Sequence, residues 1–565
     1  MAIYRSDQAV VTFGAEAALG GYPESATSNS TGVGAGALTA NTDAGTFAIS
    51  VDDTSGGVAH ANFAAGALIT IGSAATNIEL RKVVSRASTG LTLYLDAPTS
   101  VYHPNNAVIQ VVSAVADVDQ DKYMTFIPGV YDTVTVPDMT PTIEPRYFLG
   151  TGSKRNFSAA YKGTQAYNGS WPSFIALNAA ALRFPIGRMM DTAATTTSHA
   201  HGVLALNADH KKGDQFITWN GTGAATFTTS VYASIGTQIT DPGGTAPREI
   251  IKILSGSGTA GSSRLAYPLK YDHLTDAPIQ IVSGPFTHTI LETNQLDSIA
   301  MNVHMKDSDE TAANDFDRRF FGGKVGAATI AAEEGGLMVM GWDTIPFMGG
   351  IHNQKLDPNS SITGGDVPFY GLTQPIASDN VGSKTTNAST AISYPTTDPY
   401  YFSQGTVSLF GTEFARVRNF TININNNVEP RYYIERRGDS RLRGPSDIVE
   451  MRREYTMDAT IALPDTVNSA TSDTTSLFKQ LMLEGDYGAG MKGFNIQLVF
   501  TRGTNDTITI DIPGDGAAAV GLDEQGAYLT EAPHPIDGSN PYEVSASMMF
   551  RNLKITVVDS EPMYP

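Results

Sequence analysis

The sequence predicts a mainly β protein with two tandem β-sandwich modules, each with one flanking α-helix, and two small inserted β-barrel or β-sandwich modules. Two internal repeats and the composition support this prediction. One repeat has a spacing of 285 residues and the other of 170, as the positions of their shared residues show. The chain of 565 residues contains 55 glycines and many Thr, Ser and Asn residues, which suits short strands joined by tight turns.

The longer repeat relates Ile143–Phe148 (IEPRYF) to Val428–Tyr433 (VEPRYY). An alternating stretch precedes each copy, at Asp132–Val136 and at Phe420–Ile424. Because a fixed period is the signature of a repeated structural unit, the chain is predicted to be a tandem duplication of one β-rich module. The first module would comprise 1–41, 113–212 and 284–352, and the second 400–565.

The shorter repeat predicts the two small modules, at 42–112 and 213–283. It is marked by three pairs of residues at the same spacing: Glu79 and Glu249, His103 and His273, and Ile109 and Ile279. Several short strands separated by Gly, Ser, Pro and Asp are typical of a small barrel or sandwich. Each small module is therefore expected to be an insertion that projects from the shared core.

Helix start signals occur at comparable places in the two large modules. Ser170–Ser173 contains Trp171-Pro172 and predicts a helix over Phe174–Leu182. Asp473–Ser476 predicts a second helix over Leu477–Glu484, with Gly485 as its stop.

Strands are expected after each helix, where apolar residues alternate with a period of two. The alternating residues are Ile299, Met301, Val303 and Met305 in the first module and Phe494, Ile496, Leu498 and Phe500 in the second. Each module should close with further strands, in Thr329–Ile345 and in Met548–Val558. Residues 353–399 are rich in Pro, Gly, Ser, Thr and Asn and are expected to form a connecting arm.

Charge and cysteine content exclude several classes of protein. The net charge of −20 argues against a protein that grips phosphates of nucleic acid, which needs a surplus of Lys and Arg. The absence of cysteine excludes disulfides and thiolate metal sites. No secretory signal and no apolar run as long as a membrane span is found, so we expect a soluble intracellular product without membrane insertion.

A family resemblance rests on the order of segments in both large modules. In the first it is carried by Arg319–Ile345, with the turn Phe320-Phe321-Gly322-Gly323-Lys324-Val325, and in the second by Arg416–Tyr433 and Phe550–Val557. This order resembles tail tube proteins of long-tailed (siphovirus-like) bacterial or archaeal viruses. The resemblance covers the two large modules but not the insertions or the arm. Family members mostly carry one tube module per chain, whereas this chain is predicted to carry two.

The resemblance implies a structural virion protein of the viral tail. In the family, a β-sandwich with a flanking helix joins its inner strands around a ring, and rings stack into a conduit for genome ejection. Two modules per chain imply three chains in each pseudo-hexameric ring. The implied partners are other copies of the chain, the tape measure protein in the lumen, the tail terminator, the baseplate or tip proteins, and double-stranded DNA in passage. The alternative is another β-rich virion component, such as a capsid, decoration or fibre protein.

No catalytic, cofactor or metal site is predicted. Motifs such as G-x-S-x-G, H-E-x-x-H and the phosphate loop are absent from the sequence. His199 and His201 are separated by one residue, as in some metal sites, but a solvated loop is favoured. The acidic run Asp307–Asp317 does not have EF-hand spacing and is expected to be a charged hairpin. His103 and His273 are expected to make structural hydrogen bonds.

Charged residues near the longer repeat are the candidate interface residues. They are Glu144, Arg146, Lys154 and Arg155 in the first module and Glu429, Arg431, Arg436 and Arg437 in the second. In an acidic protein that assembles with itself, the basic loops are expected to pair with carboxylates of a neighbouring copy. Glu144 and Glu429 are candidate partners, each close to its own arginine.

Overall fold

Strands make up nearly all of the secondary structure in the computed structural model, so the prediction of a mainly β fold is confirmed. In the part of the chain that the structure describes, no helix has the length and apolar character needed to cross a membrane. The described residues are 4–20, 35–52, 63–65, 67–72, 77, 79–87, 92–95, 98–111, 126–138, 142–147, 159–176, 181–197, 204–220, 231–237, 247–256, 260–265, 267–307, 316–352, 398–409, 412–413, 416–433, 444–462, 493–503, 505–514, 522–523, 526–531, 533, 543–560, 562 and 564.

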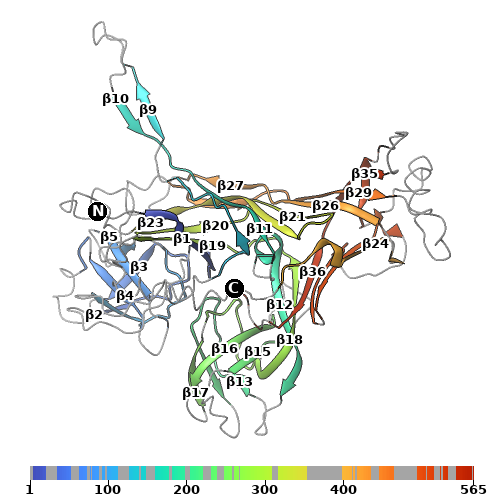
Figure 1. Cartoon of the computed structure of the whole chain (residues 1–565). Helices are drawn as coiled ribbons and strands as arrows, with labels where there is room; N and C mark the ends of the chain where they lie inside the picture. Colours follow the sequence, from blue (N-terminus) through green and yellow to red (C-terminus); the bar gives the residue numbers. More distant parts are fainter. Residues whose placement is uncertain are drawn as a thin grey trace.

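An eight-stranded antiparallel sheet crosses the whole molecule, at the top of Figure 1. Its strands, in spatial order, are β8 (Val130–Tyr131), β11 (Tyr167–Ile175), β22 (Val339–Phe347), β21 (Ala327–Glu333), β26 (Arg416–Asn425), β29 (Glu454–Ala462), β35 (Glu543–Phe550) and β34 (Tyr528–Glu531). The first four strands come from the N-terminal half and the last four from the C-terminal half. The spatial order is the same in both halves: numbered by their place along the chain, the four strands lie side by side as first, second, fourth and third.

Two further sets of four strands pack under this sheet. The N-terminal set is β1 (Tyr4–Ala15), β19 (Ile299–Asp307), β20 (Phe316–Gly323) and β23 (Gly349–His352). The C-terminal set is β24 (Gly405–Leu409), β31 (Ile496–Arg502), β32 (Asp506–Ile512) and β36 (Lys554–Asp559), with β25 (Thr412–Glu413) beside β24. In both sets, each strand pairs with the next one along the chain. Each half of the chain is therefore a two-layered β-sandwich.

One hydrophobic core runs through both sandwiches. It includes Trp171 and Trp342 in the first, and Phe420 and Phe500 in the second. The ring of Phe13 lies 5.2 Å from that of Trp342, and the Phe420 ring lies 5.8 Å from that of Phe500. Because side chains alternate across a strand, these residues fill the space between the layers while polar residues cover the outer face.

The two insertions are small six-stranded barrels with the same strand order. The first consists of β2 (Ala35–Leu38), β3 (Ala48–Asp52), β4 (Leu68–Ile71), β5 (Glu79–Arg86), β6 (Thr92–Leu95) and β7 (Val108–Val111), and its sheet closes. The second consists of β13 (Leu204–Leu206), β14 (Phe216–Asn220), β15 (Val231–Ile235), β16 (Glu249–Gly256), β17 (Ala260–Leu265) and β18 (Pro278–Glu292), and β13 pairs with β18 to close it. The first strand of each barrel precedes the expected start of its module.

Both barrels lie below the eight-stranded sheet in Figure 1, the second at the bottom and the first at the left. The long strand β18 leaves the second barrel and pairs with β12 (Gly187–Thr197) on one side and with β36 on the other. Because β36 belongs to the C-terminal sandwich, this pairing joins the two halves of the chain a second time. The two barrels also touch, since Asn77 Nδ2 donates to Asp214 Oδ1 over 2.8 Å.

The predicted helix over Phe174–Leu182 is wrong, because Phe174 and Ile175 belong to strand β11. The segment alternates with a period of two, with Tyr167 and Trp171 buried, and this alternation outweighs the capping signal. Pro172 is exposed at an irregularity in the pairing with β22, where a missing N–H group costs little. A single helical turn, α2 (Arg183–Ile186), follows.

The alternating segments after these positions are strands, as predicted, in β19 and β31. The closing segments are strands β21, β22, β35 and β36, also as predicted. The second helix, Leu477–Glu484, lies outside the described residues, as do residues 353–397 of the expected arm. The remaining short elements are η3 (Phe402–Gln404), β30 (Gly493–Phe494) and β33 (Leu522–Asp523).

Candidate assembly interface

The two copies of the Glu-Pro-Arg triplet occupy matching positions in two separate hairpins. Strand β9 (Ile143–Arg146) pairs with β10 (Ala159–Lys162), and β27 (Val428–Arg431) pairs with β28 (Asp447–Glu450). In each triplet the arginine Nη2 lies 2.7 Å from a glutamate oxygen. All four of these side chains are exposed, so the sequence prediction that each glutamate lies near its own arginine agrees with the geometry.

The basic loops lie outside the described residues. These are Lys154 and Arg155 after β9, and Arg436 and Arg437 after β27. Their predicted pairing with carboxylates of a neighbouring copy stays a prediction.

Hairpin β27–β28 packs on the N-terminal sandwich. Lys324 Nζ donates to the carbonyl oxygen of Ile448 over 2.9 Å and to Glu450 Oε1 over 2.8 Å. The Tyr432 hydroxyl donates to the carbonyl oxygen of Gln165 over 3.0 Å. Ile448 is buried by this packing, with 1% of its surface exposed.

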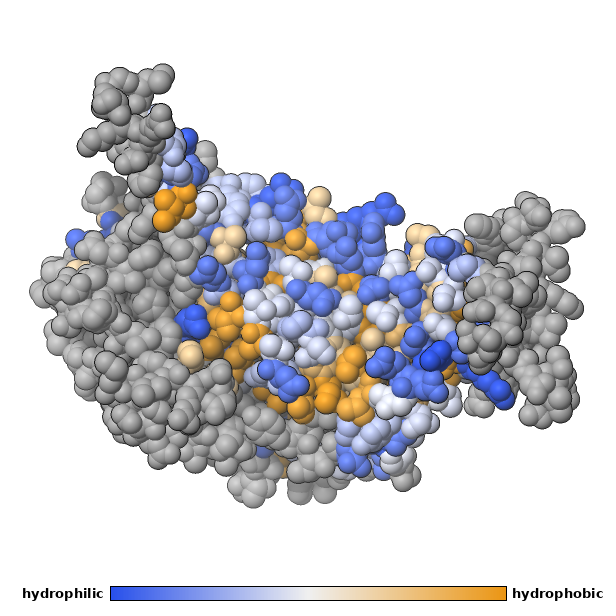
Figure 2. Space-filling model, turned by 45° about the horizontal axis from the view of Figure 1, so that its top comes forward, coloured by the Kyte–Doolittle hydropathy of each residue, from blue (hydrophilic) through white to orange (hydrophobic). Residues whose placement is uncertain are grey.

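Hairpin β9–β10 instead projects from the molecule, at the upper left of Figure 1. Ile143, Tyr147 and Tyr161 are 62%, 67% and 54% exposed. Figure 2 shows apolar surface at the base of this hairpin, among hydrophilic residues. Large apolar side chains gathered on one exposed element are a sign of an interaction site.

Among the described residues, the eight-stranded sheet ends in two strands that have a partner on one side only, one from each half of the chain. At one edge lies β8 with the segment that follows it, where Thr135 and Ser170 exchange backbone hydrogen bonds of 2.8 and 3.0 Å. At the other edge lies β34. Open edges with unpaired N–H and C=O groups can pair with another strand. Between the halves, the counterpart of such a pairing is already made, since β21 pairs with β26 over Ala327–Glu333 and Asn419–Asn425.

The outer face of this sheet is polar and mildly acidic. Strand β29 presents Glu454, Thr456 and Asp458 on this face, because Tyr455 and Met457 point into the core. Neighbouring strands continue the pattern: Ser547 Oγ donates to Asp458 Oδ1 over 2.6 Å, and Asn423 Nδ2 donates to Thr456 Oγ1 over 3.4 Å. Short hydroxyl, amide and carboxylate side chains thus cover a broad surface.

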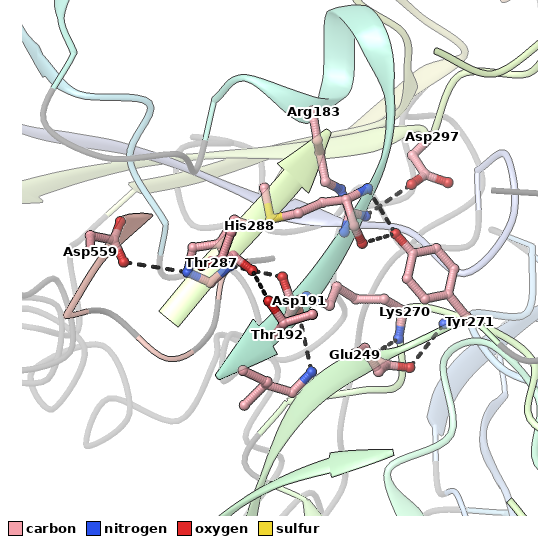
Figure 3. Close-up of polar contacts among 12 residues, drawn as sticks. Arg183, Asp191, Thr192, Glu249, Lys270, Tyr271, Thr287, His288, Asp297 and Asp559 are labelled. Atoms are coloured by element: carbon pink, nitrogen blue, oxygen red, sulfur yellow. Dashed lines mark hydrogen bonds and ion pairs between the residues drawn. The ribbon is translucent and has the colours of Figure 1, made fainter. Parts of the chain in front are cut away.

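A buried ionic cluster links the second barrel and strand β12 to strand β36 of the C-terminal sandwich (Figure 3). Lys270 Nζ donates to Asp191 Oδ2 over 2.6 Å, and His288 Nδ1 lies 2.8 Å from Asp191 Oδ1. On its other side, His288 Nε2 lies 3.3 Å from Asp559 Oδ1 at the end of β36. The Tyr564 hydroxyl donates to Asp559 Oδ2 over 2.6 Å. Both imidazole nitrogens face a carboxylate, which favours the doubly protonated, charged ring.

The pKa values of this cluster follow from its geometry. Burial lowers the pKa of His288, but the hydrogen bonds and negative charges of Asp191 and Asp559 outweigh burial and raise it to about 9. Burial raises the pKa of Asp191, whereas the charge of Lys270 and the contact with His288 lower it, with a net value of about 2. Asp191 and His288 are therefore both charged at neutral pH, and their opposite charges compensate each other.

Each barrel contains a buried Glu–His pair at the repeated positions. His103 Nε2 lies 2.8 Å from Glu79 Oε1, and His273 Nε2 lies 2.7 Å from Glu249 Oε1. Arg81 Nη2 also contacts Glu79, at 2.9 Å. The predicted structural role of both histidines fits this geometry, since each ring satisfies a carboxylate that has no access to water.

The described residues contain no group of three or more His, Asp or Glu side chains arranged to hold a metal ion. His199 and His201 lie outside them, and so do Asp309, Glu310 and Asp315 of the acidic run. Asp307 and Asp317 lie in β19 and β20, which pair as a hairpin around that run.

No sequence pattern indicated the Asp191–His288–Asp559 cluster or edge strand β34. The three charged residues are far apart in the chain and belong to no motif. The opposite edge had a signal in the alternation of Asp132–Val136.

The family model described as phage tail tube protein matches residues 8–549, which is nearly the whole chain. No curated protein matches it. The matching family is structural and is not a family of enzymes.

Proposed function

The chain belongs to the phage tail tube protein family, and we propose that three copies close each ring of the tube, each copy filling two of six equivalent positions. The protein is a structural component of the virion tail. In this proposal its two sandwiches are tandem copies of one tube module, with residues 353–399 as the connecting arm.

The strand order of the eight-stranded sheet is the observation that carries the proposal. The order β8-β11-β22-β21 is followed directly by β26-β29-β35-β34, which is the same order built from the second half of the chain. The last strand of the first set pairs with the first strand of the second. Two modules therefore meet head to tail, and this kind of contact generates a ring when its rotation divides the circle.

The open edges of the sheet fit this closure. Strand β34 has the same place in the second sandwich as β21 has in the first. Strand β8 with residues 132–136 has the same place in the first sandwich as β26 has in the second. Pairing of β34 with residues 132–136 of the next copy repeats the internal junction and leaves no open edge. Three chains would then form a barrel of 24 strands, eight from each chain.

The polar outer face of the eight-stranded sheet would line the lumen. Its hydroxyl, amide and carboxylate groups offer no cationic surface to phosphate, so double-stranded DNA could pass without being held. The two barrels lie below this sheet in Figure 1, where they would decorate the outside of the tube.

Several partners follow from this arrangement. Rings would stack head to tail through loops and the connecting arm. The tape measure protein would occupy the lumen before DNA does, and the tail terminator and baseplate or tip proteins would bind the two ends of the tube. The chain would be made in the host cytoplasm without membrane insertion. The family match favours this function over a capsid, decoration or fibre protein.

The symmetry of the tube tests the proposal. Electron micrographs of purified tubes should give an averaged cross-section with a central hole and three identical chains, each contributing two similar lobes to the inner wall. Six identical chains per ring, or a solid cross-section, would contradict it.

A further inference from the structure

We propose that hairpin β9–β10 is a lateral clasp, which packs on the C-terminal sandwich of the neighbouring copy in the same ring. This inference rests on the head-to-tail ring proposed above. It goes beyond that ring because it says what the projecting hairpin binds: an exposed surface of the C-terminal sandwich in the next copy.

The internal junction is the template for this contact. Hairpin β27–β28 of the second sandwich packs backwards on the first, through Lys324, Ile448 and Tyr432. In a head-to-tail ring, the first sandwich follows the second sandwich of the preceding copy. Hairpin β9–β10 would then pack on that second sandwich as β27–β28 packs on the first sandwich of its own chain. Within its own chain that position is outside the molecule, which accounts for its projection in Figure 1.

Exposure of the matching residues differs as this template requires. Tyr147 corresponds to Tyr432 by the spacing of 285, and it is 67% exposed where Tyr432 is 42% exposed. Ala160, paired with Pro145, is exposed, whereas Ile448, paired with Pro430, is buried. The first hairpin thus carries its apolar residues uncovered.

The receiving surface can be located from strand register. Tyr167 pairs with Phe347 in the first sandwich, and Tyr455 pairs with Phe550 in the second. Counting from these pairs, Pro346 corresponds to Met549, and Gln165, which accepts the hydrogen bond from Tyr432, corresponds to Arg453. The carbonyl oxygen of Arg453 is therefore the expected acceptor for the Tyr147 hydroxyl of the neighbouring copy.

This receiving surface exposes two methionine side chains in the single chain, next to the charged Arg452. Met549 is 48% exposed, whereas its counterpart Pro346 is buried. Met451, two residues before Arg453, is 52% exposed. Five of the ten large hydrophobic side chains that are exposed in the described residues lie on hairpin β9–β10 or on this surface. An apolar hairpin and a surface with exposed methionines at corresponding places favour a second copy as the occupant.

Cysteine cross-linking tests the clasp, because the chain has no native cysteine. The test variant carries Tyr147→Cys and Arg452→Cys, and Arg452 is chosen because its side chain is 85% exposed. The matched control carries Tyr432→Cys and Thr164→Cys, the corresponding positions of the internal junction. Assembled tubes are treated with a short bismaleimide and analysed on denaturing gels.

We expect the control to cross-link within single chains and the test variant to give covalent dimers and trimers, ending at the trimer. Products longer than a trimer would mean that the hairpin reaches another ring, and a lack of products beside a reacting control would mean that it is not docked. Either result would overturn the clasp. Neither would change the symmetry of the cross-section, which tests the three-chain ring separately.

Labelling of single-cysteine variants covers the case in which the double variant does not assemble. Maleimide labelling of Tyr147→Cys should slow by about tenfold or more when monomers assemble into tubes, because the site becomes protected. Leu274→Cys, at a 52% exposed position of the second barrel, is the control and should react at the same rate in both forms. Equal labelling of Tyr147→Cys in monomer and tube would overturn the proposal.

Discussion

The junction between the two sandwiches is closed inside the chain, whereas the outer edges of the same sandwiches are open. At the closed junction, β21 pairs with β26, hairpin β27–β28 is docked, and β18 pairs with β36 beside the buried His288. At the open edges, β8 and β34 have no second partner strand among the described residues, and hairpin β9–β10 projects. The chain thus contains one complete junction between its sandwiches, and its two outer edges are the surfaces that we propose to form the same junction between copies.

The largest expected effect comes from blocking an open edge. Thr135 directs its backbone groups to Ser170, so the N–H and C=O groups of Val134 point away from β11, towards the open side. Val134→Pro removes an N–H group that pairs with no described strand and that the proposed ring contact would use. We expect a folded chain that forms no tubes, as judged by sedimentation and electron microscopy.

Two controls separate this effect from simple loss of packing. Val134→Ala keeps the N–H group and should still form tubes. Ile422→Pro, in the closed junction, should unfold the chain, because β26 is paired on both sides. Normal tubes from Val134→Pro would show that this edge is not part of the ring contact.

The buried cluster at the closed junction should have the next largest effect. His288→Gln removes the charge between Asp191 and Asp559 and leaves two buried carboxylates with less compensation. Breaking a buried ion pair in this way costs about 3–5 kcal/mol. Urea unfolding of the monomer should show this loss in the free energy of unfolding. A loss below about 1 kcal/mol would mean that His288 does not stabilise the junction appreciably.

The same histidine should make the junction sensitive to alkaline pH. Its pKa is raised from 6.5 to about 9, so its contribution is fully present below pH 6.5 and is lost as the pH rises through 9. A shift of this size corresponds to about 3 kcal/mol. Burial raises the pKa of Glu16 to about 7, so this carboxyl group titrates near the lower end of the pH range from 7 to 10. Glu16 is present in both the wild type and His288→Gln. Unfolding curves from pH 7 to 10 should show the loss in the wild type and not in His288→Gln; parallel slopes would contradict this account.

The parts of the fold that were predictable from sequence are those with a local period. The alternation Ile299, Met301, Val303 and Met305 predicted β19, because side chains of alternate residues share one face of a strand. The helix over Phe174–Leu182 was wrong because the period-two alternation around Trp171, which outweighs the capping signal, is interrupted in the sequence by an irregularity at Pro172.

The contacts that join the halves were less accessible. Asp191 and His288 are 97 residues apart and meet only because β12 and β18 pair. No local pattern marks such a pair. The two hairpins were recognisable because their triplets repeat, but the sequence does not distinguish the docked copy from the projecting one. That distinction depends on where each module lies in the chain.

The smallest expected effect is that of the exposed ion pairs in the two hairpins. Arg146 and Arg431 each contact a glutamate at 2.7 Å, and their side chains are 59% and 41% exposed. Exposed pairs contribute about 0–1 kcal/mol, because water screens the charges and ordering two long side chains costs entropy. Arg146→Ala and Arg431→Ala should therefore each change the free energy of unfolding of the monomer by less than about 1 kcal/mol.

The two variants should differ in their effect on assembly, since the second hairpin is already docked in the monomer and the first would dock only in the proposed ring. Arg146→Ala should raise the protein concentration needed for tube formation, measured by light scattering, whereas Arg431→Ala should leave it nearly unchanged. Equal effects on assembly would show that the two hairpins are not used differently.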